Sequence, residues 1–320
     1  MIEKRTPGFV VCVLLVLATC LAGLEAEAPG QEPGRRKPIP AVEAFTLTGS
    51  PGAPFRQPTD AAFGKSSQIY VLDGLNGRVT VFNSQGQYLF SFGSQGTKAG
   101  ELSMAVGIGC APDGEVYVAD TGNHRVQVFS PEGSFLRSFG LRGGDQADPT
   151  DVQPSALKDY CYVCDNDNHE IQVYDGKSGR FLARWGGPGK MIGKFRYPAT
   201  LALDDQAHLY VVDVLNARLL SFDPYGKRGR EVASWGVGPE GLYRPKGVAV
   251  DSSGRVFVSD SYMGLVKVFD ADGNLLGVVA DPEGQARRFT TPTSLASDGR
   301  VGLCVVETRA SRVSVLRLTP

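Results

Sequence analysis

Six copies of one pattern run along this chain, and their even spacing restricts the folds that it can adopt. In each copy an apolar strand ends in an acidic residue, and a tight turn, a second strand and a glycine turn follow. The strand-end acids are Asp73, Asp120, Asp165, Asp213, Asp260 and Glu307, and they are separated by 47, 45, 48, 47 and 47 residues. Internal repeats of this length indicate an array of one structural unit, such as a solenoid or a propeller.

Each copy contains four candidate strands. In the first copy they are Thr59–Phe63, Ile69–Leu72, Arg78–Phe82 and Tyr88–Phe92. Their side chains alternate with period two, and no window has the period of an amphipathic helix. The chain has 40 glycines in 320 residues, which suits many hairpin turns. Four antiparallel strands per copy predict an all-β fold, a six-bladed β-propeller.

The sixth copy lacks its outer strand, because the chain ends at Pro320. A segment before the first copy, Val42–Gly49, resembles the outer-strand endings of the other copies. We therefore expect Val42–Thr48 to pair with Arg312–Leu316, so that an N-terminal strand closes the last blade and the propeller spans residues 41–320. Such closure would remove the exposed edges of an open array.

Three copies carry an Asp, an Asn and an Arg around the turn between the second and third strands. These sets are Asp73, Asn76 and Arg78; Asp120, Asn123 and Arg125; and Asp213, Asn216 and Arg218. The motif resembles the NHL repeat, and the resemblance covers roughly residues 40–318. It implies an NHL-type propeller, from a family that includes protein-binding and RNA-binding modules, extracellular sensor domains and, more distantly, amidating lyases and lactonase-like enzymes. We expect the motif to be structural, because Asp and Arg can pair across the turn and Asn can bind its backbone.

Three copies depart from the motif, and the sixth keeps only Arg312, with Glu307 and Ala310 at the other two positions. The fifth has Met263 and Leu265 in place of Asn and Arg, which predicts that Asp260 lacks its local partner. The third places Asp165, Asp167 and Glu170 around one turn. Three acids so close together repel one another unless a cation intervenes, and Ca²⁺ prefers oxygen ligands. A structural Ca²⁺ and a solvated acidic turn are the two interpretations, and no other cofactor is expected.

The N-terminus has the features of a targeting segment. Lys4 and Arg5 precede an apolar run of 16 residues from Phe9 to Leu24, and small residues follow up to Ala28. The run is shorter than the ~20 residues that cross a bilayer comfortably. We expect residues 1–28 to be a signal peptide, with an uncleaved or lipidated membrane anchor as the alternative, and residues 29–40 to be a linker. Each alternative predicts a secreted or periplasmic body, with membrane contact only through the N-terminal segment.

Enzymatic propellers of the lyase or lactonase type need metal ligands that converge on the central channel. His124 and His169 occupy the same turn in neighbouring copies, whereas His208 lies at the far end of a strand. A three-histidine zinc site is therefore not expected, and Cys161 and Cys164 point to opposite faces of one strand. The sequence does not exclude a catalytic set of carboxylates that line the channel. A metal-dependent lyase or lactonase-like enzyme is thus the alternative to a non-catalytic scaffold.

The connections between copies are long and carry aromatic residues beside basic ones, whereas the other loops are short and closed by glycine. Long loops on a rigid scaffold are the usual place for binding. We therefore predict a partner-binding face that docks an anionic protein or polysaccharide. Its residues are Arg196, Tyr197, Tyr243, Arg244, Met263, Arg287 and Arg288. The alternative is that the aromatic residues only fill gaps between blades. RNA binding is a further alternative, but the net charge of −1 gives no reason to expect a nucleic-acid partner.

Overall fold

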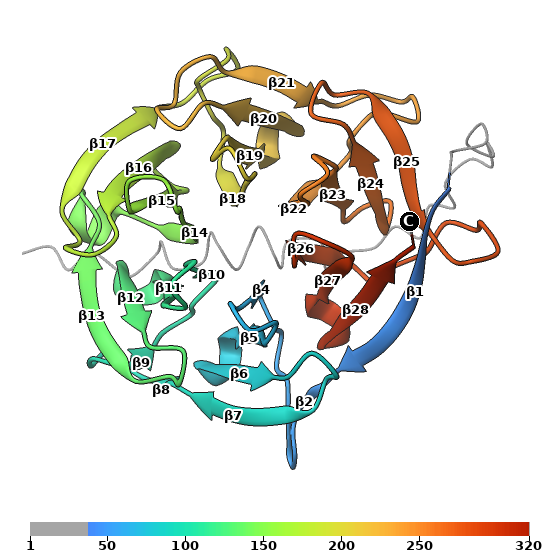
Figure 1. Ribbon diagram of the computed structural model, residues 1–320. Coiled ribbons are helices and arrows are strands. Elements are labelled where there is room, and N and C mark those ends of the chain that lie inside the picture. Colours follow the sequence, from blue (N-terminus) through green and yellow to red (C-terminus); the bar gives the residue numbers. More distant parts are fainter. Residues whose placement is uncertain (1–37, 320) are drawn as a thin grey trace, which may run out of the picture. The chain divides into compact units, whose positions relative to one another are not determined.

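The computed structural model describes residues 38–319, which form a ring of antiparallel sheets (Figure 1). Four sheets have four strands each. They contain β4 (Asp60–Phe63), β5 (Ile69–Asp73), β6 (Arg78–Phe82) and β7 (Tyr88–Phe92); β10 (Gly107–Cys110), β11 (Val116–Asp120), β12 (Arg125–Phe129) and β13 (Phe135–Gly140); β14 (Pro149–Pro154), β15 (Tyr160–Asp165), β16 (Glu170–Asp175) and β17 (Phe181–Gly186); and β18 (Pro198–Leu203), β19 (Leu209–Asp213), β20 (Arg218–Phe222) and β21 (Arg230–Ala233).

The last two repeats form one continuous sheet of eight strands. Its order is β22 (Pro245–Val250), β23 (Val256–Asp260), β24 (Leu265–Phe269), β25 (Leu275–Ala280), β1 (Pro38–Leu47), β28 (Arg312–Leu318), β27 (Gly302–Glu307) and β26 (Pro292–Ser297). The prediction of an all-β propeller is confirmed. The sheets differ from six separate blades because β1 bonds to strands of both the fifth and the sixth repeats.

The N-terminal strand pairs as the sequence predicts. β1 lies antiparallel to β28, with Ala41 opposite Leu318 and Leu47 opposite Val313. Its first residues, Pro38–Pro40, also run parallel to Val278–Ala280 of β25. These three residues were expected in the linker and are part of the strand. The predicted signal peptide and the rest of the linker lie outside the described residues. Within residues 38–319, no helix has the length and apolar character of a membrane span.

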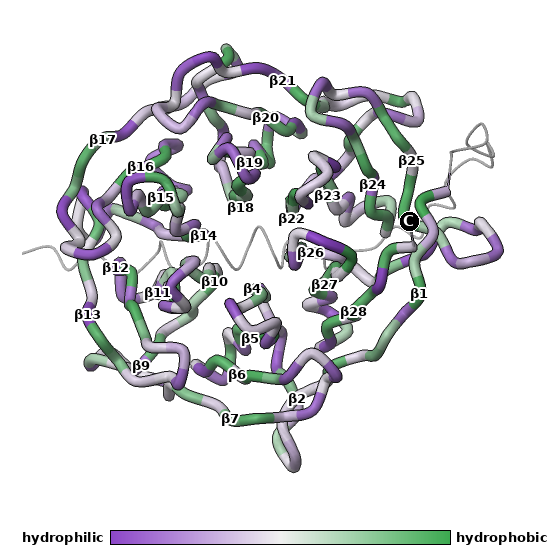
Figure 2. The backbone as a smooth tube through the Cα atoms, viewed as in Figure 1, coloured by the Kyte–Doolittle hydropathy of each residue, from purple (hydrophilic) through white to green (hydrophobic). Residues whose placement is uncertain are grey.

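The second strand of each repeat is buried along its whole length, apart from the edge of β15 and β27. Alternate residues of such a strand pack against opposite neighbours. Tyr70 and Leu72 pack with the second repeat, whereas Val71 packs with Val306 of the sixth. Hydrophobic residues therefore gather along the strands, and the perimeter loops are largely hydrophilic (Figure 2).

The blades are twisted, so the inner and outer strands run in different directions. The inner strands β4, β10, β14, β18, β22 and β26 line the centre, whereas the outer strands β7, β13, β17, β21 and β25 follow the rim (Figure 1). Each strand has a right-handed twist, and this twist accumulates from strand to strand across a sheet. Because the chain runs from the inner to the outer strand within each blade, each long connection starts at the rim and ends at the next inner strand.

Candidate functional site

The end of the blades where the inner strands begin is the candidate site, and we call it the long-loop face. Pro198 pairs with Asp213 and Pro245 pairs with Asp260, so each inner strand begins beside the end of the second strand. The turn after that second strand and the last residues of the long connection thus lie together on this face.

The strand-end acids hold the long connections in place. In all six repeats, a carboxylate oxygen accepts the backbone N–H of the residue 17 positions earlier, at 2.6–3.0 Å. The donors are Arg56, Ser103, Asp148, Arg196, Tyr243 and Thr290. A buried carboxylate needs several such donors to offset its desolvation. The acids are therefore anchors for the loops as well as partners of the turn.

The Asn and Arg of the motif complete this anchor. The predicted pairing of Asp with Arg is confirmed, whereas Asn binds the Asp carboxylate and the incoming loop instead of the backbone of the turn. In the fourth repeat, Asn216 donates to Asp213 at 2.7 Å and Arg218 donates to the same carboxylate at 2.8 Å. Arg218 also donates to the carbonyl groups of Lys190, Met191 and Lys194 in the incoming connection. The guanidinium thus joins the turn to the loop that covers it.

An apolar residue next to each anchor fills the space between neighbouring blades. Phe55, Leu102, Ala147, Phe195, Leu242 and Phe289 immediately precede the six N–H donors, and all are buried. Gap filling is therefore the role of the phenylalanines. Tyr197 and Tyr243 are only half-buried, so they are more accessible to solvent than these phenylalanines.

The fifth repeat keeps its anchor without the motif residues. Asp260 accepts the backbone N–H groups of Tyr243, Arg244, Tyr262 and Met263 at 2.8–3.2 Å. The prediction that it lacks a local partner is wrong, because backbone donors are invisible in the pattern of side chains. The missing arginine is replaced by Lys267, a fully buried residue whose Nζ donates to the carbonyl oxygen of Gly241 in the incoming loop.

The predicted binding residues of the fifth repeat form a cluster. The rings of Tyr243 and Tyr262 stack with centroids 5.7 Å apart, and the Arg244 guanidinium carbon lies 5.8 Å from the Tyr262 centroid. Tyr262 is 57 % exposed. We call Tyr243, Arg244 and Tyr262 the tyrosine–arginine cluster. Sequence analysis missed Tyr262, although its place two residues after a strand-end acid was a usable signal.

The other predicted residues have separate surroundings. Arg196 is exposed, and its carbonyl oxygen accepts the N–H of Leu215. Tyr197 contacts His169 edge-on, with centroids 4.5 Å apart. Arg288 donates to the Met263 carbonyl at 2.7 Å. Arg287 instead binds β1, through the Ala41 carbonyl at 3.2 Å and the Glu43 carboxylate at 3.3 Å.

The acids proposed for Ca²⁺ are largely engaged by protein groups. Asp165 accepts from Asn168 and Gln172, and Glu170 forms an ion pair with Arg184 at 3.3 Å. Asp167 is exposed. Among residues 38–319, no three His, Cys, Asp or Glu side chains stand close enough to share a metal ion.

The histidines and cysteines are dispersed. His208 bonds to Asp204, whereas His124 bonds to the Ala147 carbonyl. Cys161 and Cys164 pack into different clusters, as their opposite orientations predict. The four cysteines in the described part of the chain are free thiols.

The six inner strands enclose a cavity of about 150 Å³ that contains two buried carboxyl groups. Asp60 accepts from the N–H of Ile108 at 2.8 Å and from the Ser294 hydroxyl at 2.6 Å, and so joins three repeats. Asp151 accepts from the N–H of Leu201 at 2.7 Å. Burial raises the pKa of Asp60 to about 7 and that of Asp151 well above its usual range. Sequence analysis did not single out either residue.

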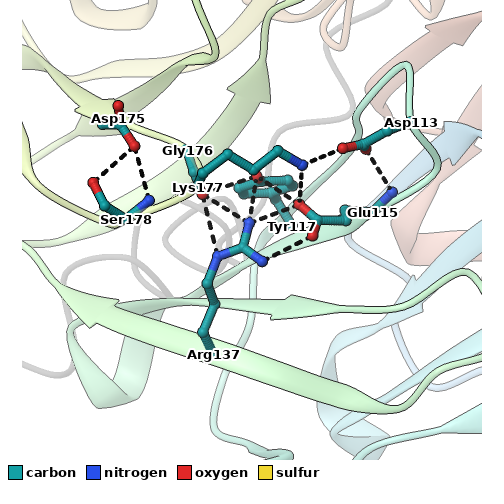
Figure 3. A network of polar contacts seen from close by, with 8 residues as sticks. All are labelled: Asp113, Glu115, Tyr117, Arg137, Asp175, Gly176, Lys177 and Ser178. Atoms are coloured by element: carbon teal, nitrogen blue, oxygen red, sulfur yellow. Dashed lines mark hydrogen bonds and ion pairs between the residues drawn. The ribbon is translucent and has the colours of Figure 1, made fainter.

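A second polar network lies at the opposite end of the strands (Figure 3). Arg137 of β13 forms a two-pronged ion pair with Glu115 at 2.8 and 2.6 Å and donates to the Gly176 carbonyl of the next repeat. Lys177 pairs with Asp113 and with Glu115. The hydrogen bonds of Arg137 lower the pKa of Glu115 to about 2, against the opposing effect of burial. The network joins the second and third repeats.

Comparison with known proteins agrees with this architecture. Residues 102–129 and 242–269 match the NHL repeat. Both segments run from a gap-filling leucine to the end of a third strand. The chain is 31 % identical to protein brain tumor of Drosophila melanogaster over 135 residues, which cover 42 % of this chain and 12 % of that protein.

Two further relatives were found. NHL repeat-containing protein 3 of Mus musculus is 33 % identical over 169 residues, or 48 % of this chain and 45 % of that protein. Peptidyl-alpha-hydroxyglycine alpha-amidating lyase 2 of Drosophila melanogaster is 28 % identical over 121 residues, or 35 % and 28 %. The chain thus covers less than half the length of each of these three relatives.

Solved propellers share the fold at low sequence identity. A gluconolactonase from Xanthomonas campestris has a TM-score of 0.65 and 15 % identity, covering 91 % of this chain and 99 % of that one. An inactive virginiamycin B lyase from Staphylococcus aureus has a TM-score of 0.57 and 12 % identity, with 88 % of both chains covered. This chain therefore contains NHL repeats and has a β-propeller fold.

Proposed function

We propose that this propeller is a non-catalytic binding protein that docks an anionic macromolecule on its long-loop face. The tyrosine–arginine cluster carries the proposal. The stacked rings of Tyr243 and Tyr262 form a rigid apolar platform, and Arg244 adds a cation beside it. Aromatic residues and arginine are the side chains most enriched at the centres of interfaces.

Two more basic groups extend this surface. Arg196 lies on the neighbouring repeat, and Arg288 is tied to the Met263 carbonyl oxygen. Arg287 is left out of the proposed contact set, because its guanidinium binds β1. Basic groups around an aromatic platform favour an acidic protein or polysaccharide and speed its association.

The proposal also includes the finer architecture and the location of the protein. The eight-stranded sheet acts as two blades, since β22–β25 and β26–β28 with β1 each repeat the four-strand order, and the propeller then has six. Residues 1–28 export the body to the periplasm or the medium. Fusion of these residues to a reporter enzyme, followed by cell fractionation, tests the export.

Retention on immobilised polyglutamate and polygalacturonate tests the binding face. The variant Arg244→Glu/Arg288→Glu should bind at least tenfold more weakly, and its binding should depend less on salt. The matched control is Lys227→Glu/Arg228→Glu, which reverses two exposed charges in a short loop. Equal losses in both variants would contradict the face assignment, and retention by oligouridylate alone would point to RNA instead.

A second pair of variants tests the aromatic platform. Tyr262→Ala should weaken retention, whereas Tyr225→Ala should not. Tyr225 is a close control, because it is 53 % exposed and lies 5.2 Å from the Lys158 ammonium group. A loss in the control alone would place the binding surface elsewhere.

A lyase or lactonase-like activity is the second candidate, favoured by the two carboxyl groups in the central cavity. Assays with a lactone and with a peptidyl-α-hydroxyglycine test it. Turnover that is lost in Asp151→Ala and kept in Arg244→Glu/Arg288→Glu would replace the binding function with catalysis.

A further inference from the structure

The third repeat presents acids where its neighbours present basic or uncharged groups. Asp148 is the loop residue held by its strand-end acid, the position that Arg196 occupies in the fourth repeat. Its N–H donates to Asp165 at 3.0 Å, and its carbonyl oxygen accepts the N–H of Asn166 at 3.0 Å. The backbone of Asp148 is thus fixed at the mouth of the inner strand β14.

The side chain of Asp148 is buried without full hydrogen bonding. The residue is 8 % exposed, and its Oδ2 atom has no hydrogen-bond partner among the described residues. A buried carboxylate oxygen without a donor is destabilising. The strand-end acids differ, because each accepts from several N–H groups.

The charged surroundings of Asp148 are mostly negative. Burial first, and then the nearby carboxylates of Asp167 and Asp165, raise its pKa to about 7, while His124 acts in the opposite sense. His124 is already bonded to the Ala147 carbonyl oxygen at 2.7 Å. Arg184 does not compensate Asp148, because it pairs with Glu170.

We propose that Asp148 and exposed Asp167 form a binding notch for a guanidinium cation, supplied either by a small molecule or by an arginine side chain of a docked polypeptide. A guanidinium group has five N–H donors in a planar fork and suits two carboxylates at once. The notch does not require three converging ligands, as a metal ion would. It is independent of the tyrosine–arginine cluster and lies on a different repeat of the same face.

Thermal unfolding of the full chain with added N-acetylarginine amide tests the notch. Saturating ligand should raise the melting temperature by about 2 °C, because it binds only the folded state. N-acetylcitrulline amide is the matched control, since it has the same shape without the charge. Stronger stabilisation by Gly-Arg-Gly amide than by N-acetylarginine amide would identify a polypeptide as the source of the cation.

The variant Asp148→Ser copies the second repeat, which has Ser103 at this position. It should lose the response to N-acetylarginine amide and should melt at a higher temperature than the parent without ligand, because the unpartnered oxygen is gone. Asp167→Asn should weaken the response and leave the unliganded melting temperature nearly unchanged. A lower melting temperature for Asp148→Ser would make Asp148 a structural residue. Stabilisation by Ca²⁺ with none by the arginine amide would overturn the proposal in favour of a metal site.

Discussion

Aspartate and glutamate have distinct roles at different positions of this protein. The strand-end acids are buried and receive several N–H donors, whereas Asp148 is buried with one oxygen unpartnered. Glu115 lies in a third setting, half-exposed beside Arg137 and Lys177 (Figure 3). The number of donors around each carboxylate determines whether it stabilises the fold.

The setting of Glu115 predicts a dependence of stability on pH. The pKa of Glu115 is lowered to about 2, chiefly by the hydrogen bonds from Arg137. A lowered pKa means that the unfolded state binds the proton more readily, so the ion pair stabilises the fold at neutral pH and this contribution is lost as the pH falls towards 2. Glu115→Gln should therefore be less stable than the parent at pH 7 by urea unfolding, with the gap closing at pH 3.

Two outcomes would contradict this prediction. One is an equal difference between Glu115→Gln and the parent at both pH values. The other is the same pH-dependent loss of stability in a variant outside the network, such as Glu132→Gln. Glu132 is a suitable control because it lies in a loop of the same repeat, where its carboxylate accepts a hydrogen bond from the Ser130 hydroxyl.

At the scale of strands and loops, each blade fastens the connection that enters it. The first, second and fourth repeats do this with an arginine on the third strand, whereas the fifth uses Lys267, two positions further along the same strand. Residues two apart on a strand point to the same side. In the fifth repeat the cationic side chain therefore comes from a position two residues further along the strand, and it still binds the incoming loop.

Substitutions at positions 265 and 267 test whether Lys267 is equivalent to the motif arginine of the other repeats. Lys267→Thr should destabilise the fold by about 2 kcal/mol, because the buried Gly241 carbonyl loses its donor. Adding Leu265→Arg restores the arrangement of the first repeat, with Arg78 and Thr80, and should recover most of the loss in urea unfolding. If Leu265→Arg makes Lys267→Thr less stable still, the two cations are not interchangeable.

At the scale of the whole molecule, β1 closes the ring. It bonds to β28 along most of its length and to β25 at its start, and Arg287 holds its backbone. Without β1 both neighbours would become sheet edges with unpaired backbone groups.

Deletion of residues 1–47 tests this closure. Calorimetry should show a melting temperature lower by at least 10 °C, roughly what the loss of several kcal/mol predicts for a domain of this size, and light scattering should show aggregation. A protein that starts at Pro38 keeps β1 and is the control. Equal melting temperatures for the two truncated proteins would show that β1 is dispensable.

The sequence by itself determined the fold and much of the anchoring motif. Period-two alternation, glycine turns and evenly spaced acids such as Asp120 and Asp213 are local signals, and each recurs six times. The orphan strand at Val42–Thr48 was also readable, because the last repeat visibly lacked one. Local patterns of this kind depend on residues that are close in the chain.

Only the tertiary structure decided which of these residues make a surface. The order of strands in the blades takes each long connection from the rim to the centre, so that Asp260 meets the backbone N–H of Tyr243, 17 residues earlier, and Lys267 meets Gly241. The same packing commits Arg287 to β1, stacks Tyr243 on Tyr262 and buries Asp148. These contacts join residues that are distant in the chain, and their burial and hydrogen bonds follow from how blades pack, which no local pattern specifies.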